Sequence, residues 1–237
     1  MKKPLLLFSF LLVLLCISTV YAQLHSSSRS MEAIIRVRPQ LDTQLRTKRL
    51  TYGSAIFIRI LKESNELEVW LKQEDDFEHF KTYNICTYGV AGLGPKIKQD
   101  DGKAPEGFYA VTPTAMNPRS SFHLSFNLGY PNEYDRVHKR TGSALMVHGD
   151  CMSIGCYAMT DAGIEEIYAL ADAALRNGQQ SSKVHIFPFR MTVENMEKHS
   201  QSVWMDFWRN LKEGYDYFER TRIPPSVRVR NQRYVFE

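Results

Sequence analysis

The chain has 237 residues, with 30 Lys and Arg residues against 26 Asp and Glu residues, and a formal net charge of +4. Such a small basic excess gives no reason to expect a nucleic-acid partner. With 43% hydrophobic residues, the chain is long enough to bury a sizeable core in one medium-sized domain.

The first 22 residues have the organisation of a secretory signal peptide. Lys2 and Lys3 precede an apolar run over residues 4–17, and the small residue Ala22 is the predicted cleavage point. The run is short for a bilayer span of roughly 20 residues, and no second apolar stretch follows. We therefore expect a soluble exported protein without stable membrane insertion.

Three cysteines remain after this cleavage: Cys86, Cys151 and Cys156. Exported cysteines usually form disulfides, and an odd number leaves at least one thiol without an internal partner. One of the three thiols therefore needs a separate explanation.

The first part of the mature chain is predicted to be rich in strands. Residues 23–50 are polar and basic, and we expect a lead-in that is partly helical from Met31. Alternating and β-branched residues then predict a sheet of antiparallel neighbours. The expected strands are residues 54–61, 66–73 and 79–89, then 108–111, into which a glycine and proline loop runs within the segment 92–113, then one strand and a turn within 121–136.

Helices are predicted mainly after residue 160. A short strand over 143–149 carries His148 at its end, and Asp161 is expected to cap a helix that Asn177 and Gly178 terminate. The remaining expected elements are a strand over 184–190, a helix from Thr192 to Lys198, and a helix from Trp204 that stops at Gly214. The fold class is α+β, with a catalytic domain over residues 51–190 and a C-terminal helical extension over 191–237.

The segment VHGDCMSIGCYAMTD, residues 147–161, places His148, Cys151 and Cys156 close together. A histidine and two thiolates could bind zinc, but no second cysteine pair exists and Asp150 is a poor fourth ligand. We expect neither a metal nor another cofactor. Alternatively, Cys151 pairs with Cys156, or one of them pairs with Cys86, and His148 is structural.

Nucleophilic catalysis is the third interpretation of this segment. A thiol is mostly protonated near neutral pH, so a catalytic cysteine needs a neighbouring base. Cys156 follows Gly155, which permits a tight turn, and His148 could reach its thiol across that turn. Backbone N–H groups of such a turn could stabilise a tetrahedral oxyanion.

These residues resemble the L,D-transpeptidase catalytic domain family over roughly residues 52–190. The resemblance lies in a His-Gly pair followed by the pattern SxGC, and in the preceding KxPxGxF pattern over 103–108. It implies that His148 is the general base and Cys156 the nucleophile. Gly149 and Gly155 then shape the site, and Ser153 supplies the hydroxyl of the motif.

Three features depart from the usual family pattern. The spacer between His148 and Cys156 is short, Ile154 takes the place of a second histidine, and Ala158 replaces an Arg or Asn. Together with GLGPK and GYPNEYDR, they resemble a periplasmic subgroup, the peptidoglycan meso-diaminopimelic acid protein amidases. The resemblance implies hydrolysis of the amide between diaminopimelate in the peptidoglycan stem peptides and the C-terminal lysine of the covalently bound outer-membrane lipoprotein.

Other functions stay open at this point. The chain could be an L,D-transpeptidase or L,D-carboxypeptidase on the same stem peptides, or a wall-binding module without catalysis. Arg136, Tyr130 and Lys103 are candidate substrate-binding residues, because they lie in polar loops next to the expected site. A solvated charged loop is the simpler explanation for each of them.

Assigning Cys156 to catalysis leaves Cys86 and Cys151 as a candidate disulfide. Cys86 ends a predicted strand near the KAPEGF loop, and Cys151 lies in the loop formed by the short spacer. The chain-entropy model gives such a bridge roughly 4 kcal/mol of stabilisation. The bridge would also prevent Cys151 from capturing Cys156.

Overall fold

The computed structural model describes residues 24–90 and 92–237. The predicted signal peptide, residues 1–22, lies outside the described residues. The helices are α1 (Ser28–Thr47), α2 (Glu133–Val137), α3 (Asp161–Arg176), α4 (Val193–Lys198) and α5 (Met205–Thr221), with a 3-10 turn over Pro113–Ala115. The predicted α+β class is confirmed.

The strands form two sheets and a hairpin. The five-stranded sheet has the order β3-β2-β1-β9-β4 and the four-stranded sheet the order β5-β6-β7-β8, while β10 pairs with β11. Their bounds are β1 (Ile56–Leu61), β2 (Glu66–Gln73), β3 (Asp76–Asn84), β4 (Gly107–Val111), β5 (Met116–Asn117), β6 (Ser125–Asn127), β7 (Met146–His148), β8 (Tyr157–Ala158), β9 (Ser182–Phe187), β10 (Val227–Arg230) and β11 (Arg233–Phe236).

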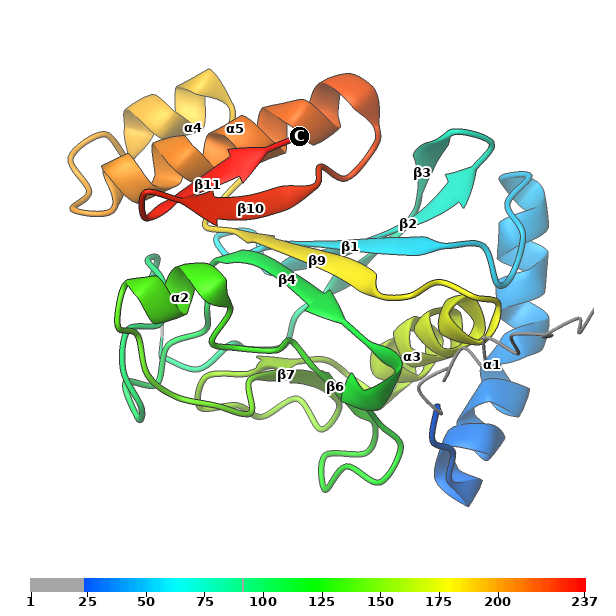
Figure 1. The fold of residues 1–237 in the computed structure, drawn as a ribbon. Coiled ribbons are helices and arrows are strands. Elements are labelled where there is room, and N and C mark those ends of the chain that lie inside the picture. The colour runs from blue at the N-terminus through cyan, green and yellow to red at the C-terminus, as the bar shows by residue number, and fades with distance from the viewer. Residues whose placement is uncertain (1–23, 91) are drawn as a thin grey trace, which may run out of the picture.

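The five-stranded sheet lies between two layers (Figure 1). Helices α4 and α5 and the β10–β11 hairpin lie on one side, and α3 and the small sheet lie on the other. All six residues of β1 are buried, because both faces of this central strand are covered. The predicted antiparallel pairing holds for β1, β2 and β3, whereas β1 and β9 pair in parallel.

Helix α1 contributes to the core, which the interpretation of residues 23–50 as a polar lead-in missed. Helix α1 begins at Ser28, three residues before the expected start, because Ser27 and Ser30 form a capping box. Ala33, Leu41 and Leu45 are buried in the largest apolar cluster. These few apolar residues share one face of the helix, so a mostly polar sequence still packs.

The predicted end of the last helix at Gly214 is wrong. Helix α5 continues to Thr221, because Gly214 serves packing and not termination. A Cβ atom at this position would lie 2.4 Å from Phe236 Cε1 and 2.6 Å from Phe108 Cζ. The C-terminal extension also contains the β10–β11 hairpin, so it is not purely helical.

A disulfide joins Cys86, just after β3, to Cys151, in the loop after β7. This is the pair expected from the sequence. Next to the bridge, Thr87 and Ala158 form an isolated antiparallel β-bridge. The disulfide therefore links the loop after β7 to the segment that follows β3.

Replacing Gly214 by alanine should destabilise the protein by about 1–3 kcal/mol, because the added methyl group overpacks the contact with Phe108 and Phe236. The same change in an open helix position would stabilise the helix by about 1 kcal/mol. Urea unfolding measures the difference, with Arg220→Ala on the exposed face of α5 as the matched control. A stability equal to or above the wild type would contradict the packing role.

Removing the disulfide through Cys86→Ser together with Cys151→Ser should lower the free energy of unfolding by roughly 4 kcal/mol, since the unfolded chain loses a long closed loop. Urea unfolding under non-reducing conditions tests this value. Peptide mapping of the wild type should give a Cys86–Cys151 peptide that disappears on reduction. A map that pairs Cys151 with Cys156 would overturn the assignment.

Candidate active site

Strands β7 and β8 bring His148 and Cys156 together. The strands pair in parallel, with Val147 opposite Tyr157 and His148 opposite Ala158. Side chains alternate along strands, so His148 and Cys156, which directly precedes β8, lie on the same face in diagonal positions. No hydrogen bond joins the imidazole to Sγ in the part of the chain that the structure describes.

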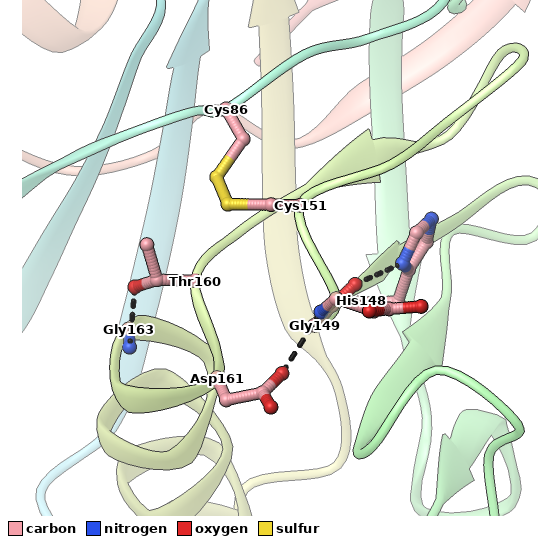
Figure 2. Close-up of a disulfide and its surroundings, with 8 residues drawn as sticks. Cys86, His148, Gly149, Cys151, Thr160, Asp161 and Gly163 are labelled. Carbon is pink, nitrogen blue, oxygen red and sulfur yellow. Dashed lines mark hydrogen bonds between the residues drawn. A yellow bond between two sulfur atoms is a disulfide. The ribbon is translucent and has the colours of Figure 1, made fainter.

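The imidazole of His148 is held in its neutral form. Its side chain is buried, and Nδ1 lies 2.6 Å from the carbonyl oxygen of Gly149 (Figure 2). A carbonyl can only accept, so Nδ1 carries the proton and donates, which leaves the Nε2 lone pair free. Burial lowers the pKa of His148, against the opposing effects of the Gly149 carbonyl and Asp150. The imidazole is therefore uncharged near neutral pH.

Helix α3 fixes the loop that follows His148. A Cβ atom at Gly149 would lie 2.5 Å from Asp161 Oδ1, and the same oxygen accepts a hydrogen bond of 2.8 Å from Asp150 N–H. The N-cap of α3 is Thr160, whose side chain accepts from Gly163 N–H, and not Asp161 as predicted. Asp161 is thereby free to hold the loop, as Figure 2 shows.

A second set of contacts shapes the turn before Cys156. Ser153 Oγ accepts a hydrogen bond of 3.0 Å from Gly155 N–H and donates one of 2.7 Å to the Cys156 carbonyl. Gly155 has a φ of 148°, which a residue with a side chain rarely adopts. The Gly149 N–H donates to the carbonyls of Phe122 and Leu124. The N–H groups of Gly149 and Gly155 thus already have acceptors within the protein. These two glycines therefore shape the loop and the turn and do not offer free N–H donors to an oxyanion.

Cys156 is half-buried and is the free cysteine among the described residues. Its sulfur accepts a hydrogen bond of 3.4 Å from Met146 N–H, and the thiol donates to the Ala144 carbonyl at 3.7 Å. Burial raises the pKa of the Cys156 thiol, while the Met146 N–H and the Lys96 charge act in the opposite direction. The resting thiol is therefore protonated near neutral pH.

Cys156 opens onto a pocket of about 290 Å³. The residues that line it come from three separate segments: Lys96, Gln99, Asp100 and Gly102; Ser143, Ala144 and Leu145; and Ile154, Gly155 and Cys156. Lys96 was not among the site residues predicted from the sequence. The GLGPK pattern contains this lysine but gives it no role.

The three candidate substrate-binding residues have different positions. Lys103 lies in the loop against the Cys156 turn, where its carbonyl would be 3.3 Å from a Cβ at Gly155. Tyr130 lines a neighbouring groove of about 660 Å³, which shares Ser143 and Ala144 with the Cys156 pocket. Arg136 is exposed on α2 and donates to the Pro131 carbonyl at 2.6 Å. It lines neither of these two hollows.

No group of three or more metal-ligating side chains occurs in residues 24–90 and 92–237. Within the same ranges, no helix combines the length and the apolar character needed to cross a membrane.

Comparison with known proteins identifies the family of this chain. The model of the L,D-transpeptidase catalytic domain (YkuD) matches residues 56–186. YafK of Escherichia coli strain K12, provisionally named an L,D-transpeptidase, is 45% identical over 235 residues, which cover 99% of this chain and 90% of that protein. The protein of the same name in Escherichia coli O157:H7 matches equally.

Two solved structures overlap with the chain at low identity. A variant of the helical cell shape determining protein Pgp2 of Campylobacter jejuni has 17% identity and a TM-score of 0.47, over 81% of this chain and 65% of that one. Bd1075 of Bdellovibrio bacteriovorus has 16% identity and a TM-score of 0.42, over 75% and 78%. From the family model and the extended identity with YafK, this chain belongs to the L,D-transpeptidase catalytic domain family.

Proposed function

We propose that the protein is a cysteine-dependent amidase that acts on peptidoglycan stem peptides in the periplasm. The bond cleaved is the amide between diaminopimelate and the C-terminal lysine of a covalently attached outer-membrane lipoprotein. One observation carries the proposal: the free thiol of Cys156 faces a pocket and shares a strand face with a buried His148 whose Nε2 is unprotonated.

Acylation is the first half of the proposed reaction. The Cys156 thiol gives its proton to His148 Nε2 as Sγ attacks the diaminopimelyl carbonyl, and the Cys156 N–H donates to the oxyanion. The imidazolium then protonates the lysine nitrogen, the C–N bond breaks and the amine departs. The product bound to the enzyme is a thioester on Cys156.

Deacylation uses the same base. His148 removes a proton from water, the hydroxide attacks the thioester carbonyl, and Cys156 leaves as the thiol after it regains the proton. Gly149 supports both halves, because its carbonyl accepts from Nδ1 and stabilises the positive charge that forms on the ring. The products are a free diaminopimelate carboxylate and a lipoprotein with a free lysine amine.

Two positions near the nucleophile favour water over an amine as the acceptor. Ala158, opposite His148, is fully buried and offers no polar side-chain group. Ile154, on the pocket rim, is 91% exposed and also lacks such a group. An amine acceptor would need hydrogen-bonding partners to align it, whereas water needs only the base.

The variant Cys156→Ala should abolish lipoprotein release, because no other free thiol lines the pocket among the described residues. Purified protein is incubated with lipoprotein-bearing sacculi, and the products are identified by mass spectrometry. Circular dichroism checks that the variant keeps its fold. Substantial release by this variant would remove the mechanism, and cross-linked stem peptides from the wild type would favour transpeptidation instead.

The pH dependence of kcat/KM should show an acid limb with a midpoint below 6.5. Burial lowers the pKa of His148 below the pKa of a free histidine. The imidazole therefore stays unprotonated, and able to act as a base, down to a lower pH. Rates measured across the acid range, with His148→Ala as the comparison, test this. An acid limb that survives in His148→Ala would assign the titration to another group.

A further inference from the structure

Lys96 is a buried cation in the wall of the Cys156 pocket. Its side chain is 6% exposed, although a lysine ammonium is strongly solvated when free. The aliphatic stem passes Gly142, where an added Cβ would lie 2.8 Å from Lys96 Cε. The lysine is therefore held between the 96–101 loop and the segment that also carries Ser143 and Ala144.

The hydrogen bonds of this ion pair are unequal. Asp101 is saturated, because its two oxygens accept from the N–H groups of Ile97, Lys98 and Lys103 and from Lys96 Nζ at 2.7 Å. Lys96 Nζ has this single acceptor in the described part of the chain. An ammonium has three donors, so two of them lack a protein partner. Buried donors of a charged group are costly when unpaired, so these two donors are suited to an anionic acceptor in the pocket.

The position of the ammonium relative to the nucleophile agrees with such an acceptor. Lys96 and Cys156 line the same pocket, which Asp101 does not, and the charge of Lys96 lowers the pKa of the thiol. The positive end of the pair is thus the one that faces the reacting atoms. Asp100 also lines the pocket, but it is exposed to solvent, whereas Lys96 is buried in the pocket wall.

We propose that Lys96 is a specificity-determining residue that binds a substrate carboxylate through Nζ. The inference rests on the proposed function, because the proposed substrate determines which carboxylates can enter the pocket. Two carboxylates of the proposed substrate have the required chemistry. One is the free carboxylate of diaminopimelate, and the other is the α-carboxylate of the lysine whose side-chain amine leaves.

Alkylation of Cys156 tests the anion site without the enzymatic reaction. Iodoacetate and iodoacetamide both form a thioether with loss of iodide, but only iodoacetate carries a carboxylate. The ratio of their rate constants cancels any change in the thiolate population, which affects both reagents equally. The mature protein is used without reductant, so that the Cys86–Cys151 disulfide stays closed and Cys156 is the thiol that reacts.

The iodoacetate to iodoacetamide ratio should fall about tenfold in Lys96→Met, as expected for the loss of one charge-assisted contact. Lys98→Met is the matched control, because Lys98 is exposed in the same loop and should leave the ratio unchanged. Asp101→Asn should raise the ratio by removing the counter-charge, and this variant decides the matter if Lys96→Met fails to fold. An unchanged ratio in the folded Lys96→Met, or no rise in Asp101→Asn, would overturn the proposal.

Synthetic peptides distinguish the two carboxylates. In one peptide the free diaminopimelate carboxylate is amidated, and in another the α-carboxylate of the leaving lysine is amidated. The carboxylate that Lys96 binds is the one whose amidation raises KM in the wild type but not in Lys96→Met. If neither amidation raises KM, Lys96 does not recognise the substrate. If no peptide is hydrolysed while the alkylation ratio still depends on Lys96, the amidase proposal fails and the anion site stands.

Discussion

Close backbone contacts among Gly89, Gly102 and Gly155 hold the turn that presents Cys156. A Cβ atom at Gly89 would lie 2.5 Å from both the Gly102 oxygen and the Gly155 nitrogen. The backbones around Gly89 and Gly102 therefore meet the distant turn at Gly155 with no side chain between them. The Thr87–Ala158 bridge and the Cys86–Cys151 disulfide secure the first segment, so the position of Cys156 depends on tertiary contacts.

A buried polar cluster extends this constraint to the C-terminal helix. Lys62 Nζ donates to the Gly94 carbonyl at 2.8 Å and to Glu106 Oε1 at 3.0 Å, and Trp208 on α5 donates to Glu106 Oε2 at 2.8 Å. The Lys62–Glu106 pair is almost fully buried, so removing one partner would leave an uncompensated charge. Through Gly94, two residues before Lys96, helix α5 braces the loop that carries the cation of the pocket.

Burial sets the chemistry of the resting site. It raises the pKa of Cys156 and lowers that of His148, so both groups are neutral before substrate binds. In the proposed reaction, the charges are therefore created during catalysis. The Gly149 carbonyl would stabilise the imidazolium, and the Met146 N–H would stabilise the thiolate. Such oriented backbone dipoles need little reorganisation when those charges appear.

Local pattern was enough to predict most regular elements and the candidate nucleophile. The pattern over residues 66–73 predicts β2 with its observed bounds, and the Thr192 cap and the turn over residues 153–156 are short-range features. The His-Gly and SxGC patterns indicated His148 and Cys156 as candidate catalytic residues, because catalytic chemistry restricts residue type within a few positions. These patterns involve residues that are close together in sequence, so they can be recognised without knowledge of the fold.

Tertiary structure decided what depends on distant partners. Gly214 has the local appearance of a helix end, but Phe108 and Phe236 make it a packing position inside α5. Residues 23–50 look like a polar lead-in until α3 covers the narrow apolar face of α1. Arg136, on α2, and Lys96, in a loop, are both basic residues, and only the fold exposes the first and buries the second beside Cys156. Composition shows that a charge is present, whereas its surroundings determine whether it acts on the site.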